Sequence, residues 1–305
     1  MRYRPEIDGM RTIAVLSVIF YHANFSMFSG GFIGVDIFFV ISGFLITKVI
    51  RKEILVDNFS FLNFYEKRIR RIFPALFFVV LSSLIISVYV LPPVDAKHFF
   101  QSMFATITFS SNFLFWIQSG DYFDVGSIYK PLHHTWSLSL EEQFYLFHPF
   151  LLIFISKLKD YKQLIIIVLS IFISLTFSHF YLNLDLKGNF YLLPFRMWEL
   201  FAGALLAFIN LDKIRNKFSN MQQDIFACIG IAIVFISIFS FNPKTLHPSF
   251  ITIAPILGSC IIIIFSTTKG LSGKLLSNKL SVYIGLISYF MALPNICFFS
   301  IYFNK

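Results

Sequence analysis

Charged side chains are scarce in this sequence of 305 residues: they make up 13 % of it, whereas hydrophobic residues make up 57 %. A soluble domain carries roughly a quarter charged residues. The shortage leaves too little polar surface to cover a soluble fold of this size, and the mean hydropathy of +0.74 agrees. The composition therefore excludes a soluble globular protein and indicates an integral membrane protein.

Several motifs of metal proteins and soluble enzymes are also absent. The three cysteines, Cys228, Cys260 and Cys297, lie in apolar segments without CxxC spacing, as small buried hydrophobic residues do. The sequence contains no phosphate-binding Walker loop and no GxSxG nucleophile elbow. His133 and His134 are adjacent, which suits no usual metal geometry on a helix. We therefore expect no metal site.

Long apolar runs are what the sequence has instead. The runs 72–92, 163–182, 224–241 and 247–268 approach or exceed the roughly 20 residues that a helix needs to cross a bilayer. They predict an all-α, polytopic integral membrane protein with about nine spanning helices. The expected spans lie near residues 10–27, 32–50, 72–92, 136–156, 163–182, 192–210, 224–241, 247–266 and 280–303.

The basic residues predict the orientation in the membrane. Most of the 25 lysines and arginines fall in alternate connections, and the other connections hold only Lys97, Lys130, Lys187 and Lys244. Connections rich in lysine and arginine stay on the cytoplasmic side, so we expect the N-terminus in the cytoplasm. The net charge of +9 arises from these connections and does not indicate a nucleic-acid partner.

The segment 98–117 conflicts with this orientation. Arg71 and Lys157 are both expected on the cytoplasmic side, which requires an even number of crossings, yet three apolar segments lie between them. We expect the middle one to re-enter and leave on the periplasmic side, buried among other helices; the alternative is an ordinary span and an exception to the charge rule. It is the least lipid-like, with Gln101, Ser102, Thr106, Thr108, Ser110, Ser111 and Asn112.

Ionisable side chains inside apolar spans mark candidate functional positions, because they are costly in lipid. Arg11 and His22 are eleven residues apart in the first span, so they share one helix face about 16 Å apart. Because of this pairing, two interpretations of His22 are open: a catalytic residue, or a packing residue. Asp36 in the second span is a candidate to orient an imidazole. Arg196 and Glu199 predict an ion pair within one helix, and a substrate contact is the second interpretation.

Arg68 and Arg71 form a second candidate group, directly before the third span. They are three residues apart and so face the same way. Two guanidinium groups on one face suit a clamp for the phosphates of a cytoplasmic donor. Lys67 and Arg70, on the other face, suit anchors that fix the topology.

A third candidate group opens the span 136–156. Glu141 and Glu142 lie close to Trp136 and Tyr145 in the sequence. An interfacial aromatic belt is one interpretation. The density of polar groups favours the other, a polar pocket near the periplasmic face.

With these residues in place, the chain resembles the bacterial acyltransferase-3 family of membrane O-acyltransferases over nearly its whole length. Each motif alone is weak, but five occur in order. They are Arg11-x10-His22, the Gly31–Thr47 block, Phe64-Tyr-x-x-Arg68-x-x-Arg71-Ile-x-Pro74, Thr135-Trp-Ser-Leu-x-x-Glu141-Glu142-Gln-Phe-Tyr145 and Arg196-x-x-Glu199-Leu. The N-terminal Tyr3–Gly9 stretch looks like that of the subgroup fused to a C-terminal periplasmic SGNH-type domain.

The resemblance implies acyl transfer, usually of acetyl, from cytoplasmic acetyl-CoA across the inner membrane. The acceptor would be a sugar hydroxyl of lipopolysaccharide, peptidoglycan or exopolysaccharide. His22 would be the catalytic imidazole, as a general base or a transient acyl carrier, and Arg11 would handle the donor. Arg68 and Arg71 would grip the CoA phosphates. The pocket that receives the glycan would contain Trp136, Glu141 and Glu142.

The C-terminal end departs from the family pattern. Family members typically continue the Ile-Ser-Tyr motif with a Tyr-Leu-Trp-His-Trp-Pro-like run, but here Ile287-Ser288-Tyr289 is followed by Phe-Met-Ala-Leu-Pro. One choice of codons for this run, shifted by one nucleotide, reads Leu-Trp-His-Cys-Pro. We therefore expect a transmembrane acyltransferase domain over 1–305 that is incomplete at its C-terminus. A frameshifted, inactive remnant is one alternative function.

A polytopic transporter or flippase is the alternative from another functional class. Such proteins often contain two similar halves with paired interrupted helices. The sequence shows no such symmetry, so we favour the acyltransferase.

Overall fold

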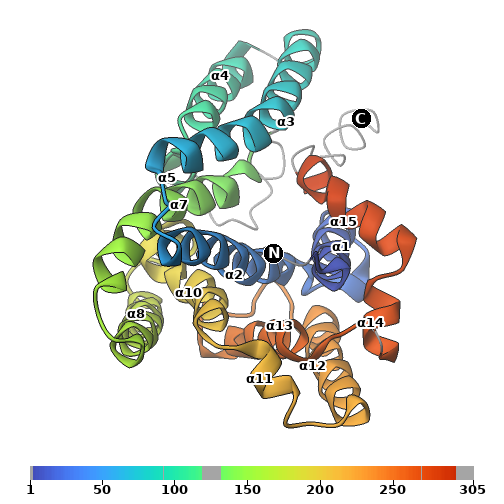
Figure 1. Cartoon of the computed structure of the whole chain (residues 1–305). Helices are drawn as coiled ribbons and strands as arrows, with labels where there is room; N and C mark the ends of the chain where they lie inside the picture. The colour runs from blue at the N-terminus through green and yellow to red at the C-terminus, as the bar shows by residue number, and fades with distance from the viewer. Residues whose placement is uncertain (1–2, 92, 119–131, 269, 293–305) are drawn as a thin grey trace.

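The computed structural model describes residues 3–91, 93–118, 132–268 and 270–292, and every regular element in these ranges is a helix (Figure 1). The predicted all-α fold is confirmed. Three short 3-10 helices accompany the α-helices, at Ser26–Phe28, Gly31–Ile33 and Phe250–Thr252. The α-helices are α1 Pro5–His22, α2 Gly34–Leu55, α3 Phe61–Val90, α4 Pro93–Ile107, α5 Ser111–Gln118, α7 Thr135–Ser156, α8 Asp160–Tyr181, α9 Leu186–Tyr191, α10 Leu193–Phe208, α11 Leu211–Arg215, α12 Asn220–Ser240, α13 Ile253–Phe265, α14 Leu271–Leu276 and α15 Lys279–Ala292.

Six helical segments of the described ranges are long and apolar enough to cross a membrane: α2, α3, α7, α8, α9 with α10, and α12. This confirms a polytopic membrane protein. The first, eighth and ninth predicted spans correspond to α1, α13 and α15, of 18, 13 and 14 residues. A crossing helix needs roughly 20 residues, so these three crossings stay predictions. The run from Leu293 onward, where the sequence departs from the family pattern, lies outside the described residues.

Helices α2 and α10 form the centre of the bundle. About two thirds of the apolar stretch of each is buried, 67 % and 61 %, against 22 % for the peripheral α8. Gly43 of α2 and Gly203 of α10 lie where the two helices cross. A β-carbon at Gly43 would collide with the carbonyl of Leu200, and one at Gly203 with that of Val40. The two backbones therefore approach as closely as only small residues allow.

The predicted re-entrant segment is not one straight helix. It is divided between α4 and α5, which break at residues 108–110, where Phe109 has a φ of 52°. Neither helix is long enough to cross a bilayer. Its buried hydroxyls pack against α7: Thr106 bonds to Thr135 at 2.9 Å, and Ser111 bonds to Ser139 at 2.8 Å. The predicted burial is confirmed for these groups, and re-entry stays a prediction.

One predicted boundary was wrong, and another helix is longer than its predicted span. Helix α3 begins at Phe61, before the span expected from residue 72, so Arg68 and Arg71 lie within this helix. The first span was expected to reach residue 27, but α1 ends at His22. Hydropathy marks only the part of a helix that suits lipid, while backbone hydrogen bonds and caps set where the helix ends.

Helix α2 divides the bundle into two sides. In Figure 1, α3, α5 and α7 lie above α2, and α11, α12 and α13 lie below it. Helix α1 packs against both α2 and α15. Each side of α2 lines a separate cavity.

Candidate active site

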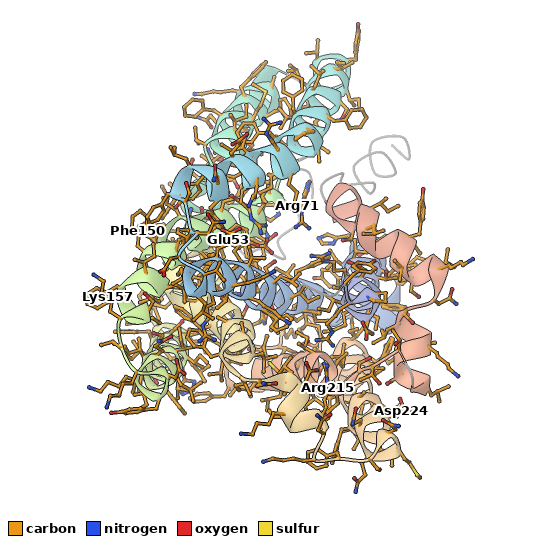
Figure 2. All side chains as sticks on the ribbon, in the orientation of Figure 1. Glu53, Arg71, Phe150, Lys157, Arg215 and Asp224 are labelled. Atoms are coloured by element: carbon orange, nitrogen blue, oxygen red, sulfur yellow. The ribbon has the colours of Figure 1, made fainter. Side chains whose placement is uncertain are left out.

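A cavity of about 160 Å³ lies between α1, α2, α3, α7 and α15. Side chains from distant parts of the sequence converge on it, and Figure 2 shows Arg71 on the side of α3 that faces α2 and α15. It brings together every predicted site residue except Asp36. These residues are Arg11, His22, Arg68, Arg71, Trp136, Glu141 and Glu142.

The basic residues on α3 form two groups, one with ion-pair partners and one without. Lys67 bonds to Glu53 at 3.1 Å, and Arg70 bonds to Glu66 at 2.8 Å, on the outside of the helix. Arg68 and Arg71 line the cavity, and within the described ranges neither has an ion-pair partner. The guanidinium of Arg68 lies 5.1 Å from the centre of the Tyr145 ring. The two cavity arginines are thus available to an anionic ligand.

Arg11 is held in place by its own helix. Its Nη1 lies 2.8 Å from the Asp8 carboxylate, three residues earlier and so on the same face. Asp8 is fixed in turn by Tyr3, whose hydroxyl donates to the other carboxylate oxygen at 2.7 Å. Arg11 is therefore a positioned cation at the wall of the cavity.

The two glutamates of α7 lie beside these arginines. Glu141 accepts hydrogen bonds from Ser42 at 3.0 Å and from Tyr145 at 3.1 Å. Its electrostatic neighbours include Arg11 and Arg68. One buried oxygen of Glu142 has no hydrogen-bond partner in the described structure. Buried carboxylates beside guanidinium groups favour a role in orienting those groups.

His22 lies at the last residue of α1 and faces the cavity. Its Nδ1 is 2.8 Å from the carbonyl oxygen of Val18. A carbonyl can only accept, so Nδ1 carries the hydrogen and Nε2 has a free lone pair. The tautomer of His22 therefore leaves Nε2 able to act as a base or a nucleophile.

His134 is a cavity residue to which the sequence analysis gave no role. Both of its ring nitrogens are buried, and neither has a hydrogen-bond partner in the described ranges. The adjacent His133 is bonded to the hydroxyl of Tyr191 at 2.6 Å. Adjacent residues on a helical turn point in different directions, so only one of the two histidines reaches the cavity. The sequence shows the pair but not which member faces inward.

The cavity has a basic end and an imidazole end. The electrostatic neighbours of Arg11 include Tyr145, and those of His134 include His22. Helices α1 and α7 therefore run in opposite directions along the cavity. Arg11 and His22 are eleven residues apart, and so are His134 and Tyr145, which corresponds to about 16 Å along each helix axis. Glu141 lies toward the basic end, near Arg11 and Arg68, and the expected position of the glutamates near the periplasmic face stays a prediction.

Asp36 belongs to a different cluster. Its carboxylate lies 2.6 Å from Arg196, which also bonds to Glu199 at 3.0 Å and to His247 at 2.9 Å. The predicted Arg196–Glu199 ion pair is confirmed. Asp36 does lie 3.4 Å from an imidazole, but that imidazole is His247. Asp36 bonds α2 to α10 and does not line the cavity, and its catalytic role stays a prediction.

Trp136 forms part of the cavity wall and of the packing behind it. Its ring is 1 % exposed and lies 4.5 Å from the ring of Phe190, between centroids. The Arg196 guanidinium lies 5.6 Å from the same ring. Trp136 thus links the wall of the cavity to the Arg196 cluster.

The acyltransferase domain family matches residues 4–302. A peptidoglycan O-acetyltransferase OatA of Listeria monocytogenes is 34 % identical over 299 residues, which cover 94 % of this chain and 48 % of that protein. The O-acetyltransferase OatA of Staphylococcus aureus is 32 % identical over 315 residues, 99 % of this chain and 52 % of that protein. The chain spans about half the length of these curated relatives, and no solved structure matches it.

Proposed function

The chain belongs to the acyltransferase-3 family, and from this premise we propose that it transfers an acetyl group to a hydroxyl of a cell-envelope glycan. Peptidoglycan is the first acceptor to test, because the Listeria relative is named for it. Lipopolysaccharide and exopolysaccharide are the other candidates. One observation carries the proposal: a single cavity joins three arginines to two imidazoles.

The donor in this proposal is acetyl-CoA. Arg68 and Arg71 bind its phosphates at the basic end, because their guanidinium groups have no ion-pair partner among the described residues. The pantetheine arm of the donor then runs along the cavity toward His22. Arg11, held by Asp8, adds a third cation near the phosphates. We place this end, and the N-terminus, on the cytoplasmic side of the inner membrane, in agreement with the basic connections.

The reaction exchanges one bond for another at the acetyl carbon. The acceptor oxygen forms a bond to that carbon, the bond from carbon to the thioester sulfur breaks, and the hydroxyl proton ends on the CoA thiol. His22 Nε2 serves as a general base, or it carries the acetyl group between two half-reactions. The hydrogen bond from Nδ1 to Val18 holds the ring for either role.

His134 supplies the second imidazole. It lines the same cavity, and its nitrogens have no partner in the described structure that would compete with a substrate. In the acetyl-carrier route His134 accepts the proton of the acceptor hydroxyl as that oxygen displaces His22 Nε2 from the acetyl carbon, and it passes this proton to the CoA thiolate released in the first half-reaction. In the general-base route His22 itself moves that proton to the thiolate, and His134 orients the acceptor hydroxyl by a hydrogen bond. The imidazole is neutral before and after the transfer, so the proton balance closes. Trp136 forms the wall beside the acceptor.

The test is mass spectrometry of envelope glycans from cells that express the chain, a His22→Ala variant or an empty vector. Ester-linked acetyl groups with the chain, and none with the variant, support the proposal. Acetylation that survives His22→Ala removes His22 from the mechanism. If the chain is in the membrane and a host with a suitable acceptor shows no acetylation, the inactive remnant is favoured. Sequencing the locus then decides whether a downstream frame encodes the missing motif.

A further inference from the structure

A second, larger cavity lies on the opposite side of α2. It has a volume of about 840 Å³, within the range of about 300–1,000 Å³ for ligand sites. Ser42 and Ile46 of α2 line the first cavity, whereas Phe44, Lys48 and Lys52 line the second. The latter three are spaced four residues apart and form one helix face. Figure 2 shows Arg71 and Arg215 on opposite sides of α2. The second cavity is therefore separate from the candidate active site.

Two arginines in this cavity are anchored at one carbonyl. Arg4 Nη2 lies 2.9 Å from the carbonyl oxygen of Ile263, and Arg215 Nη2 lies 3.0 Å from the same atom. The two Nη2 atoms are thus no more than about 6 Å apart. Ile263 is in the last turn of α13, whose unpaired carbonyls attract cations. This helix end explains why the arginines are held in place, but it uses only part of their hydrogen-bonding capacity.

Positive charge exceeds negative charge around the cavity. Its charged lining consists of Arg4, Lys48, Lys52 and Arg215 against Glu6 and Asp212. Asp212 is already paired with Arg215 at 3.2 Å. Burial, followed by the nearby charge of Arg215, lowers the pKa of Arg4 to about 10. The cations thus lie close enough to repel one another, and an anion between them would relieve that repulsion.

One cationic donor is left without a partner. Arg4 Nη1 is buried and has no hydrogen-bond partner in the described part of the chain. Lys48 and Lys52 have no ion-pair partner there either; the Lys48 ammonium lies 5.1 Å from the Phe44 ring centre. A buried, unsatisfied cationic donor is costly and calls for a ligand. Asn210, Asn216 and Thr267 add neutral polar groups to the same lining.

We propose that this second cavity binds a phosphate group, held by Arg4, Lys48 and Lys52. The phosphate belongs to a lipid headgroup or to a soluble phosphate compound, and the same chemistry recognises both. The site does not depend on the acetyl-transfer proposal, because it lies on the other face of α2.

Binding to the purified full chain tests the proposal. Native mass spectrometry would measure retained phosphatidylglycerol, with phosphatidylcholine as the zwitterionic comparison. Equilibrium dialysis would measure inorganic phosphate and 3′,5′-ADP. The variant is Lys48→Gln with Lys52→Gln, which removes two cavity charges. The matched control is Lys157→Gln with Lys159→Gln, which removes two exposed charges from a different connection.

We expect the cavity variant to bind the phosphate probe at least about tenfold more weakly than the wild type, and the control to bind as the wild type does. A loss confined to phosphatidylglycerol identifies a lipid headgroup, and a loss confined to 3′,5′-ADP or phosphate identifies a soluble ligand. Equal affinity of the wild type and the cavity variant for every probe overturns the proposal, as does the absence of binding to the wild type. A loss of binding in the cavity variant does not bear on acetyl transfer, which the glycan measurement tests separately; absence of 3′,5′-ADP binding to the wild type would also count against donor binding at Arg68 and Arg71.

Discussion

At the scale of single residues, hydrogen-bond partners separate the groups that can react from those that hold the fold. His22 donates a hydrogen bond from Nδ1 to the carbonyl oxygen of Val18, which leaves Nε2 free. His133 is bonded to Tyr191, while His134 has no partner in the described ranges. Ordinary sequence patterns cannot distinguish two adjacent histidines, because the distinction depends on which of them meets a partner from another helix.

Substitution by glutamine is expected to have different effects at His133 and His134. His134→Gln removes a proton acceptor from the cavity and is expected to lower kcat for acetyl transfer by about 100-fold or more, with little change in thermal stability. His133→Gln removes a buried hydrogen bond to Tyr191 and is expected to lower the unfolding temperature instead. Steady-state kinetics and thermal unfolding of both purified variants check this. An unchanged kcat in His134→Gln would show that His134 takes no part in the mechanism.

The arginines of α3 predict a similar contrast. Arg68→Gln and Arg71→Gln are each expected to raise KM for acetyl-CoA by about tenfold, because each removes a charge-assisted hydrogen bond to phosphate. Lys67→Gln and Arg70→Gln are the controls, since these residues form ion pairs on the outer face. Initial rates at varied acetyl-CoA concentration measure the effect. An equal rise in KM for the control variants would mean that only the total charge matters.

At the scale of elements, the Arg196 cluster bonds α2 to α10. The guanidinium and both carboxylates are fully buried, at 0 % exposure. The sequence predicts the pair of Arg196 with Glu199, because these residues are three apart on one helix. It cannot predict Asp36 as the third member, since that contact joins residues 160 positions apart. The sequence therefore placed Asp36 with His22, whereas the structure places it with Arg196.

Asp36→Asn distinguishes a structural role from a catalytic one. The variant leaves Arg196 with one buried carboxylate instead of two, and we expect a lower unfolding temperature. Activity per folded molecule is expected to stay unchanged, because Asp36 does not line the cavity. Arg196→Met leaves two buried carboxylates without their cation and is expected to cost about 3–5 kcal/mol. Normal stability with lost activity in Asp36→Asn would return it to the catalytic group.

The crossing of α2 and α10 gives a further prediction at this scale. Gly43→Ala places a β-carbon against the Leu200 carbonyl and is expected to reduce the free energy of unfolding by about 1–3 kcal/mol. Leu169→Ala on the peripheral α8, where the side chain is 52 % exposed, serves as the control and is expected to have little effect. Thermal unfolding in detergent compares the two. Equal stability would show that the helices can separate at no cost.

At the scale of the whole molecule, composition predicted the fold class, and the motifs named seven residues that the structure brings to one cavity; their roles stay predictions. Hydropathy located the long spans, because lipid selects apolar residues over about 20 positions. It did not show where α3 begins, since the helix continues into the polar stretch that carries Arg68. It also missed the break between α4 and α5 at residues 108–110, which depends on local backbone geometry.

Orientation in the membrane is the large-scale prediction still to be tested. In a background without the native cysteines, Asn216→Cys is expected to react only with reagent on the cytoplasmic side, and Lys244→Cys only with reagent outside. The basic connections support this assignment. Labelling of intact cells with a membrane-impermeant maleimide checks this assignment. Labelling of Asn216→Cys in intact cells would contradict it and indicate the opposite orientation.

In the proposed mechanism, one cavity takes an acetyl donor at its arginines and delivers the acetyl group at its imidazoles. The most direct measurement uses the full chain in proteoliposomes supplied with acetyl-CoA labelled in the acetyl group, together with a peptidoglycan acceptor. We expect ester-linked label on the acceptor with the wild type, and none with His22→Ala. Label transferred equally by both proteins, or by neither, would contradict the account.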